Sequence, residues 1–491
     1  MLPKEFLISL EGIEGYDAAA FEKVHADGGQ VTSIRFNPLK APVGAPGEEG
    51  PAVEGLSDRD VPAEGWSIEM YAPADGGFPS AYAPDGGGPL AKVPWSSWGY
   101  YLEQRPSFTF DPLFHAGVYY VQEASSMLLE QALRQTSDLQ KPLRVLDLCA
   151  APGGKSTLLH SLLSPDSLLV SNEVIRTRVG VLQENMVKWG AANVIITNND
   201  PRDFQRLENY FDVIVVDAPC SGSGLFRREP EAIGEWSEEN VQLCHQRQQR
   251  ILADCWPALR QGGLLIYSTC SYSKEEDEDI LDWLLSEQQA VGCPLSMDKS
   301  WNVIESGSEK GGYGYRCYPD KLKGEGFFIT CVRKEDGGEF SYPRKGKQMP
   351  GKLTRQEEER MRPWIKQDVF FFRFNDQVHA LPLHLVEDLA YLQTVCYLKK
   401  AGVLTGTLAA KEFIPEHDLA LSTLINREAP AIGLTKEQAI QYLRKEEIRV
   451  DTEQRGWALV QYKGQNLGWI KILPNRVNNY YPKEWRILKR G

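Results

Sequence analysis

Short apolar runs recur along the middle of the chain, from about residue 142 to residue 270. Each run is rich in β-branched residues, is apolar at nearly every position and ends in polar or small residues. This pattern is typical of strands that are buried on both faces of a parallel sheet. The predicted strands lie in the segments LRVLDLCA, SLLVSNE, ANVIITNND, FDVIVVDAP and GLLIYSTCS.

Amphipathic stretches with helical spacing separate several of these runs. One is RTRVGVLQENMVKWG, and another is VQLCHQRQQRILADCWPALRQGG, a helix that we expect its glycine pair to close. This alternation predicts an α/β fold with a Rossmann-like, doubly wound and mostly parallel sheet. Ligands bind at the carboxyl ends of the strands of such a sheet. The polar residues that end each strand are therefore candidate site residues.

Smaller modules are predicted on both sides of this sheet. Before it, TSIRFNPLK contains a strand, and a loop over residues 41–91 is too rich in Pro, Gly and acids to bury much surface. After it, FFFRFNDQVHALP predicts strands and TKEQAIQYLRKEE predicts a helix capped by its threonine. The last segment predicts a β-rich module whose short strands are joined at Lys-Gly and Leu-Gly turns.

Charge is unevenly distributed over the 491 residues. The net charge of −13 argues at first against a nucleic-acid partner. However, residues 41–91 carry nine acids and one base, whereas residues 455–491 carry eight bases and one acid. The acidity is thus largely local. The basic C-terminal end is suited to face RNA, and we expect the acidic loop to lie away from that face.

Several classes of protein are excluded by what the sequence lacks. No apolar run approaches the roughly 18 residues of a membrane span, and the N-terminus lacks the pattern of a secretory signal. We therefore expect a cytoplasmic protein with no membrane partner. The nine cysteines form no CxxC pair, and no Cys and His residues cluster at zinc spacing, so we expect reduced thiols and no metal site.

The segment LDLCAAPGGKST runs from a predicted strand through a glycine turn into a predicted helix. Glycines let backbone amides approach a ligand, and a helix N-terminus favours a carboxylate or a phosphate. The spacing is neither that of a Walker loop nor GxGxxG. The candidate cofactor-binding residues of this loop are Cys149, Ala150, Ala151, Pro152, Gly153, Gly154 and Lys155.

Three acids follow successive strands around this turn. Glu173 is placed to hold ribose hydroxyls, Asp200 suits an adenine amino group, and Asp217 ends the fourth strand. Together they predict a pocket for a polar, partly cationic nucleoside, and S-adenosylmethionine fits that description. Arg178 is more simply a charge on a helix face, although a contact with the cofactor stays open.

Two cysteines also end neighbouring strands, Cys220 in DAPCSGSG and Cys270 in YSTCSYS. A helix is predicted to begin near Lys274, and helix N-termini lower thiol pKa values. The residues alone leave the two thiols as nearly equal candidates for a nucleophile. The thiols of the remaining cysteines are predicted to be small hydrophobic groups without a chemical role, and Cys149 contributes only its backbone to the cofactor loop. These cysteines are Cys149, Cys244, Cys255, Cys293, Cys317, Cys331 and Cys396.

Four segments, LDLCAAPGGKST, DAPCSGSG, YSTCSYSKEEDE and KGEGFF, together resemble the motifs of the NOL1/NOP2/Sun family of RNA cytosine-5 methyltransferases. Their order and spacing match that family over residues 105–334, and SIRFNPLK and YYVQEASSM are similar to its N-terminal flank. The ending of the chain is similar to the PUA-like tail of the branch that methylates 16S ribosomal RNA. One departure is Asp320, which stands after Pro319 where a histidine is expected.

The resemblance implies a class I methyltransferase that uses S-adenosylmethionine and acts as a monomer on 16S ribosomal RNA or the small ribosomal subunit, not on DNA. A transfer RNA methyltransferase and a non-catalytic RNA-binding assembly factor are the alternatives. The implied division of the chain is an N-terminal RNA-binding α+β module (1–104), the methyltransferase domain (105–334), a linker (335–356), an intermediate domain (357–430) and a PUA-like RNA-binding domain (431–491).

Carbon 5 of cytosine becomes nucleophilic enough to accept a methyl group only after a thiolate has added to carbon 6. In the family the cysteine of the Thr-Cys pair attacks, and that of the Pro-Cys pair assists release of the product. The resemblance therefore implies that Cys270 is the nucleophile and that Cys220 assists release. Asp217 would then contact the ring near nitrogen 3.

RNA contacts are expected near this site and in the tail, because a target base must leave its stack to reach a pocket. Arg227 and Arg228 follow the Cys220 loop and are candidate phosphate ligands, and Arg35 is a weaker candidate. Aromatic residues of the tail are more often core than stacking residues, but they are interleaved with bases. They are Trp457, Tyr462, Trp469, Tyr480, Tyr481 and Trp485.

Overall fold

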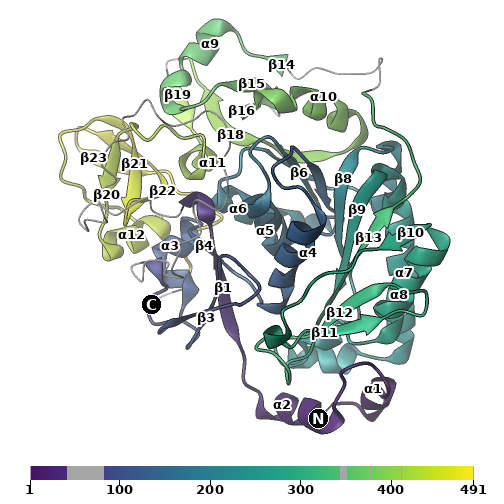
Figure 1. Ribbon diagram of the computed structural model, residues 1–491. Helices are drawn as coiled ribbons and strands as arrows, with labels where there is room; N and C mark the ends of the chain where they lie inside the picture. Colours follow the sequence, from purple (N-terminus) through teal and green to yellow (C-terminus); the bar gives the residue numbers. More distant parts are fainter. Residues whose placement is uncertain (1, 41–81, 343–350, 375–376, 411, 490–491) are drawn as a thin grey trace, which may run out of the picture.

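The computed structural model describes residues 2–40, 82–342, 351–374, 377–410 and 412–489. The strands within these ranges form four sheets, and the largest of them has ten strands (Figure 1).

All of the predicted parallel strands lie side by side in the large sheet, in the order β9-β8-β5-β6-β7. The chain order reverses at β5, which lies between β6 and β8, so the carboxyl ends of these strands border a switch point where ligands bind. The predicted doubly wound core is confirmed. Its strands are β5 (Arg144–Asp147), β6 (Leu168–Asn172), β7 (Val194–Thr197), β8 (Phe211–Asp217) and β9 (Leu259–Thr269).

Antiparallel strands extend this sheet on both sides. Beyond β9 come β13 (Phe327–Lys334), β12 (Tyr313–Cys317) and β11 (Ile304–Gly307), and the short β10 (Ala290–Gly292) also pairs with β13. At the opposite edge β17 (Leu398–Ala401) pairs with β7. The segment predicted as an intermediate domain therefore supplies the edge strand of the large sheet.

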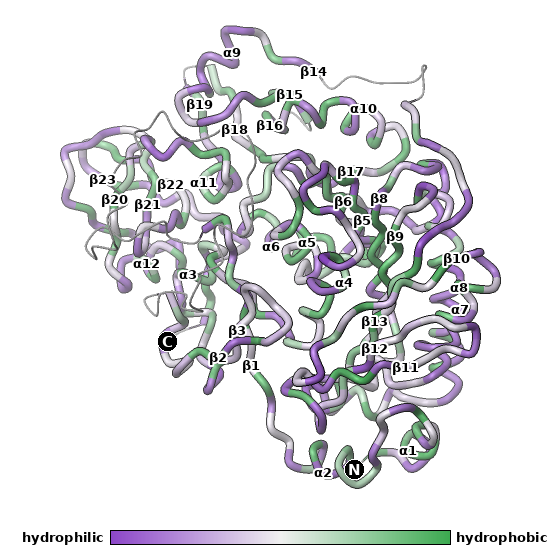
Figure 2. Tube along the Cα trace, in the orientation of Figure 1, coloured by the Kyte–Doolittle hydropathy of each residue, from purple (hydrophilic) through white to green (hydrophobic). Residues whose placement is uncertain are grey.

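Helices cover both faces of the large sheet because alternate residues of each strand point to opposite sides. One layer packs on Val145 and Leu169, and the other on Leu146 and Val170. Figure 2 shows the strands as a hydrophobic band between helices with more hydrophilic outer positions. The first layer is α4 (Leu129–Thr136), α5 (Gly154–Leu162) and α6 (Arg176–Trp189); the second is α7 (Glu238–Cys255), α8 (Glu278–Glu287) and α10 (Val386–Val395).

The expected end of α7 at a glycine pair is wrong. The helix ends at Cys255, because Pro257 follows in a short 3₁₀ turn and cannot donate to the helical hydrogen-bond ladder. Gly262 and Gly263 lie within β9 instead.

The N-terminal module confirms the strand predicted in TSIRF. Its sheet has the order β2-β3-β1-β4, and because β4 pairs with β1, this sheet extends past the expected boundary at residue 104. Residues 41–81 of the acidic loop lie outside the described residues. The elements are α1 (Lys4–Ser9), α2 (Ala18–Asp27), β1 (Thr32–Phe36), β2 (Leu90–Lys92), β3 (Gly99–Leu102), α3 (Pro112–His115) and β4 (Tyr119–Val121).

The C-terminal half contains two further sheets. The strands predicted in FFFRFNDQVHALP are confirmed as β15 and β16, which form an antiparallel pair. This sheet consists of β14 (Gly351–Lys352), β15 (Val369–Phe374), β16 (Gln377–Pro382), β18 (Val403–Leu408) and β19 (Phe413–Pro415), with α9 (Arg355–Glu359) and α11 (His417–Leu421) beside it.

The last module is β-rich, as expected. Thr435 caps α12 with a reciprocal contact to Gln438, so the predicted cap is confirmed. Lys463 and Gly464 form the turn between β21 and β22, but the expected Leu-Gly turn is wrong because Gly468 lies within β22. A side chain at Gly468 would collide with Tyr442 and His417. The elements are β20 (Ala431–Gly433), α12 (Lys436–Leu443), β21 (Gly456–Tyr462), β22 (Gln465–Leu473) and β23 (Arg476–Asn479).

The N-terminal sheet packs against the last module of the chain (Figure 1). Ile34 and Tyr100 of the N-terminal sheet share one apolar cluster with Tyr442 and Ile470 of the last module. At the described end of the acidic loop, Asp85 forms an ion pair with Lys436. The N-terminal sheet and the last module therefore form one structural unit beside the large sheet, whereas α1 and α2 pack against the predicted methyltransferase domain.

Candidate active site

The loop between β5 and α5 forms one side of the site. Gly153 has a φ of +114°, a conformation that residues with a side chain rarely adopt. Arg178 Nη2 donates a hydrogen bond of 2.5 Å to the carbonyl of Ala151, and Asn185 Nδ2 donates one of 2.8 Å to that of Pro152. Arg178, predicted as a helix-face charge, thus holds the loop in place.

Asp147, the last residue of β5, was not predicted as a site residue. Its Oδ2 accepts a 2.6 Å hydrogen bond from Ser156, whereas its Oδ1 is buried and has no hydrogen-bond partner. Burial raises the pKa of this carboxyl to about 7. The available signal was an acid that ends a buried strand immediately before the glycine turn. An unsatisfied carboxyl beside such a loop is suited to a ligand that donates hydrogen bonds or carries positive charge.

Glu173 and Asp200 lie at the same edge of the sheet. Glu173 is buried, accepts a 2.8 Å hydrogen bond from the amide of Ile175 and lies 3.5 Å from Arg178. Asn172 Nδ2 donates to the carbonyls of both Leu148 and Asn199, which fixes the ends of β6 and β7 against the loop.

Asp200, next to Asn199, caps the following turn through the amide of Arg202 at 3.2 Å. Its side chain is 31% exposed, so it remains accessible to a ligand. Glu173 and Asp200, the acids predicted at the ends of β6 and β7, thus lie at the edge of the sheet that carries the glycine loop.

Asp217 joins the cofactor loop to the thiols. Its Oδ2 lies 2.7 Å from Lys155 Nζ, and its Oδ1 accepts a 2.9 Å hydrogen bond from Ser268. Burial alone would lower the pKa of the Lys155 ammonium, but Asp217 and Asp147 raise it above its ordinary value. The ammonium also lies 5.2 Å from the centre of the Phe327 ring, in the KGEGFF segment. Lys155 is therefore a permanent cation between the two halves of the site.

Cys220 and Cys270 meet at the ends of β8 and β9, with their sulfur atoms 3.1 Å apart. Both are free thiols and both are half-buried. The contact with Cys270 and burial hold the pKa of the Cys220 thiol well above its ordinary value. Cys220 is therefore a protonated thiol placed against the sulfur of Cys270.

Glycines let three turns pack against one another at this point. The amide of Gly224 donates to the carbonyl of Cys270 at 2.7 Å, and the amide of Gly326 donates to the carbonyl of Gly224 at 3.2 Å. A Cβ atom on Gly224 would lie 2.6 Å from the Cys270 carbonyl oxygen and 2.7 Å from that of Gly326. These contacts explain why the DAPCSGSG and KGEGFF segments contain glycine.

Glu276 fixes the two turns that carry Cys220 and Cys270, the thiol turns, and was not predicted as a site residue. The buried carboxylate accepts hydrogen bonds from the Ser221 amide at 2.8 Å, the Ser221 hydroxyl at 2.5 Å and the Ser271 hydroxyl at 2.6 Å. Burial raises the pKa of Glu276. Its available signal was only the acidic run after Cys270. That run starts with a 3₁₀ turn at Lys274, and α8 begins at Glu278, four residues later than predicted.

Two of the three arginines proposed as phosphate ligands are buried. Arg35 is 1% exposed and donates to Gln122 at 2.8 Å and to Thr157 at 2.6 Å, so it joins the N-terminal sheet to α5 and is not a surface contact. The side chain of Arg227 is 5% exposed and lies 3.6 Å from Glu325. Arg228, with a side chain that is 54% exposed, remains accessible.

Most of the aromatic residues of the tail belong to the core, as the sequence favoured. Trp469 and Tyr481 are each 1% exposed and Trp457 is also buried, whereas Tyr480 is 39% exposed. Tyr462 and Trp485 pack at the edge of the apolar cluster that the N-terminal sheet shares with the last module.

Asp320, where a histidine was expected, has a side chain that is 4% exposed and lies 2.8 Å from Lys321. In the described part of the chain, no group of three His, Cys, Asp or Glu side chains could hold a metal ion. No helix there has the length and apolar character to cross a membrane.

Comparison with known proteins identifies related chains. Residues 135–333 match the family described as 16S rRNA methyltransferase RsmB/F, residues 80–124 match the N-terminal domain of 16S rRNA methyltransferase RsmF, and residues 429–487 match the methyltransferase RsmF PUA domain. Ribosomal RNA small subunit methyltransferase F of Shewanella loihica is 30% identical over 409 residues, covering 80% of this chain and 83% of the relative.

The protein of the same name from Aeromonas salmonicida is 30% identical over 411 residues, covering 80% of this chain and 84% of the relative. A crystal structure of a methyltransferase homologue from Pyrococcus horikoshii is 27% identical with a TM-score of 0.50, covering 67% of this chain and 93% of that structure.

These matches indicate S-adenosylmethionine as the cofactor, and the residues at the strand ends fit it. The buried Asp147 and Glu173 lie beside the glycine loop, where a nucleoside with a positively charged sulfur requires acceptors and negative charge. The chain is thus an S-adenosylmethionine-dependent RNA methyltransferase with a PUA domain, and it belongs to the family of 16S rRNA methyltransferases RsmB/F.

Proposed function

We propose that this enzyme methylates carbon 5 of cytidine in 16S ribosomal RNA through a covalent bond between Cys270 and the base. The observation that carries the proposal is the 3.1 Å contact between the sulfur atoms of Cys220 and Cys270, next to the Lys155–Asp217 pair. A methyltransferase that acts on a nitrogen or oxygen atom needs no thiol at its reaction centre. The names of the relatives support the choice of RNA.

In the first half of the reaction Cys270 loses its proton to solvent, and its sulfur forms a bond to carbon 6 of the cytosine. The electron pair of the 5,6 double bond then moves to carbon 5, and negative charge spreads toward nitrogen 3. Asp217 accepts a hydrogen bond from the exocyclic amino group beside nitrogen 3, while the Lys155 cation stabilises the developing negative charge. Bound S-adenosylmethionine supplies the methyl group that carbon 5 takes up.

In the second half the bond between Cys270 and carbon 6 breaks. The protonated Cys220 gives its proton to the departing sulfur, which restores the Cys270 thiol, and the resulting Cys220 thiolate accepts the proton that leaves carbon 5. The electron pair of that carbon–hydrogen bond re-forms the double bond. The high pKa of the Cys220 thiol keeps it protonated until release and makes the resulting thiolate a strong base for the proton of carbon 5.

Replacement of each cysteine tests these roles. We expect Cys270→Ala to abolish methyl transfer from labelled S-adenosylmethionine to unmodified small-subunit RNA. We expect Cys220→Ala to accumulate a protein–RNA adduct that survives denaturing electrophoresis, because release is blocked after the adduct has formed. An active Cys270→Ala variant together with an inactive, adduct-free Cys220→Ala variant would reverse the assignment.

The substrate is tested with the same assay. Transfer to 16S ribosomal RNA and mapping of 5-methylcytidine by bisulfite sequencing would support the proposal. Transfer to transfer RNA alone, or RNA binding with no transfer to either RNA, would replace it with the corresponding alternative.

A further inference from the structure

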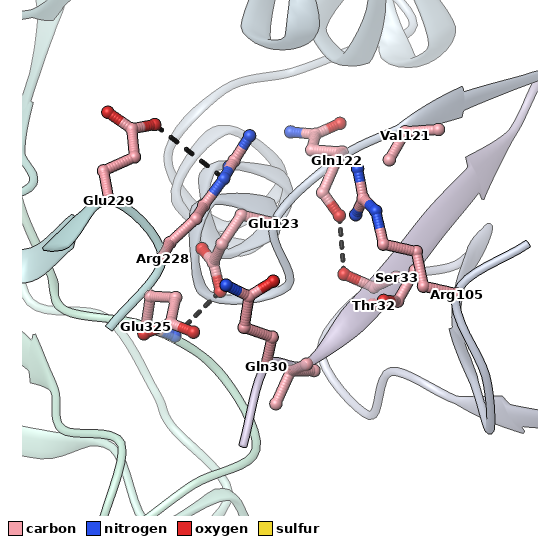
Figure 3. A pocket seen from close by; sticks show the side chains of 11 residues that line it. Gln30, Thr32, Ser33, Arg105, Val121, Gln122, Glu123, Arg228, Glu229 and Glu325 are labelled. Carbon is pink, nitrogen blue, oxygen red and sulfur yellow. Dashed lines mark hydrogen bonds and ion pairs between the residues drawn. The ribbon is translucent and has the colours of Figure 1, made fainter. Parts of the chain in front are cut away.

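A polar pocket lies between the N-terminal sheet and the segments that carry Arg228 and Glu325, outside the residues assigned above to cofactor or catalysis (Figure 3). Its lining includes Ser33 of β1, Gln122 just after β4, and Arg105, Arg228 and Glu325. At about 210 Å³ it is smaller than the roughly 300–1,000 Å³ of pockets for drug-sized ligands. Its size therefore suits one planar base better than a longer piece of a chain.

Short connections join this pocket to both halves of the active site. Glu325 directly precedes Gly326, whose amide donates to the turn that follows Cys220. On the other side, Val121 of the lining directly follows Tyr120, whose ring lies against Gly154 of the cofactor loop. The pocket therefore borders segments that contact both halves of the active site, where the nucleotides beside a bound target base would pass.

Glu325 is an unsatisfied acid in the lining of this pocket. Its side chain is 4% exposed, and its Oε2 lies 3.6 Å from Arg227 Nη1 and accepts no hydrogen bond. Burial raises the pKa of Glu325 to about 7, against the opposing effects of Arg227 and Arg228 and with a further increase from Glu123. Buried carboxyl oxygens in folded proteins almost always have partners. A ligand that donates a hydrogen bond would supply the missing one.

Glu123 differs from Glu325 although it lines the same pocket. Its two carboxylate oxygens accept from the backbone amides of Ser125, Ser126 and Glu325, each at 2.9 Å. Glu123 therefore has a structural task within the turn, whereas Glu325, although paired with Arg227, keeps an Oε2 atom that accepts no hydrogen bond.

Two cations lie at the rim of the pocket. Figure 3 shows Arg228 and Arg105 on opposite sides, with Gln122 between them. The Arg228 side chain is 54% exposed and lies 4.0 Å from Glu229, and Arg105 is exposed beside Phe108. Exposed guanidinium groups on both sides of a base-sized pocket suit the phosphates on the two sides of a nucleotide.

We propose that this pocket binds the base of a nucleotide that flanks the target in the RNA, that Glu325 selects a base with an exocyclic amino group, and that Arg105 and Arg228 hold the adjoining phosphates. A glutamate accepts hydrogen bonds from an amino group of the kind that adenine and cytosine carry and uracil lacks. This assignment rests on the proposed function, since it presupposes that the thiols receive a base from RNA.

Binding of short RNAs tests the proposal without any methyl transfer. The probes are fluorescent seven-nucleotide RNAs with a central cytidine between uridines, and a series in which each uridine in turn is replaced by adenosine. For the wild-type enzyme we expect one flanking position at which adenosine tightens binding about fivefold or more. Glu325→Ala should bring that preference below about twofold, whereas Glu325→Gln, which keeps an acceptor oxygen, should retain it.

Arg228→Gln provides a second variant at an exposed position that does not endanger the fold. It should weaken binding of every probe by a similar factor of about three and leave the adenosine preference intact, because phosphate contacts carry no sequence information. Arg250→Gln, exposed on α7, is the matched control and should change neither property.

A wild-type enzyme without any preferred flanking position, or a preference that survives in Glu325→Ala, would overturn the proposal. Methyl transfer separates this outcome from failure of the proposed function. An enzyme with the preference that forms no 5-methylcytidine would refute the reaction and leave the pocket assignment standing. Formation of 5-methylcytidine without the preference would refute the pocket assignment alone.

Discussion

The two halves of the active site lie at the same edge of the sheet but are held in different ways. In the cofactor half, a loop with a left-handed glycine is fixed by Arg178 and Asn185 of the next helix, and Asp147 keeps an oxygen without a partner. In the thiol half, Glu276 accepts four hydrogen bonds, from Ser221, Ser271 and Gln248, and ties two separate turns together. The cofactor half retains a hydrogen-bond acceptor without a partner, which a ligand can use. The thiol half instead uses its polar groups to position two sulfur atoms.

Removal of the central acid of the thiol half should have the largest effect. In Glu276→Ala the Ser221 and Ser271 hydrogen bonds are lost and the sulfur atoms are no longer held together, so we expect kcat to fall about 100-fold. The affinity for S-adenosylmethionine, measured by calorimetry, should stay within about twofold. Glu275→Ala next to it is the control for a change of charge.

Loss of cofactor affinity in Glu276→Ala would show that the two halves are not held independently. An unchanged kcat would show that Glu276 does not position the two thiols.

Disturbance of the glycine turn should have the opposite pattern and a smaller effect. Ala at position 153 must adopt a φ near +114°, so Gly153→Ala distorts the loop, and we expect the Kd for S-adenosylmethionine to rise about tenfold. RNA binding should be unaffected. Equilibrium dialysis with labelled cofactor measures the first quantity and fluorescence anisotropy the second.

Gly180→Ala is the matched control for this change. It lies inside α6, and a Cβ atom there meets no other atom within 4 Å, so the same substitution should leave cofactor binding unchanged and stabilise the helix by about 0.5–1 kcal/mol. Equal loss of cofactor binding in both variants would contradict the role given to the turn.

The unsatisfied carboxyl of the cofactor half should produce the smallest effect, a dependence of stability on pH. Because the pKa of Asp147 is raised to about 7 in the folded enzyme, its contribution to stability is full below pH 4 and is lost as the pH rises toward 7. Asp147→Asn does not ionise. We therefore compare the Tm of the variant with that of the wild type, both without cofactor. The Tm of the variant minus that of the wild type should be about 3 °C larger at pH 7.5 than at pH 5.

Calorimetric melting at the two pH values measures this difference. A difference between variant and wild type that does not change with pH would show that Asp147 is already ionised at pH 5.

Local patterns predicted much of this molecule. The apolar runs predicted the parallel strands, and the strand ends predicted Glu173, Asp217, Cys220 and Cys270 as neighbours at one edge, because the periodicity of a strand depends on nearby residues. The two cysteines could be ranked only through a family resemblance.

Long-range partners could not be predicted in this way. Glu276 binds Ser221, which is 55 residues away along the chain, and Arg35 binds Thr157, which is 122 residues away. The residues that flank Arg35 and Arg227 in the sequence do not show whether these side chains are buried or exposed. The glycine pair after α7 misled the prediction because Pro257 ended the helix first.

The pairing of β17 with β7 has a consequence for the biogenesis of this enzyme. A nascent chain that has emerged only as far as residue 334 has every strand of the catalytic sheet except the one that covers the β7 edge. That edge carries unpaired backbone groups until residues 398–401 arrive, and open edges of this kind template association between chains. Synthesis of the C-terminal half thus acts as the last protective step for the catalytic domain, and an enzyme shortened to that domain would be prone to self-association.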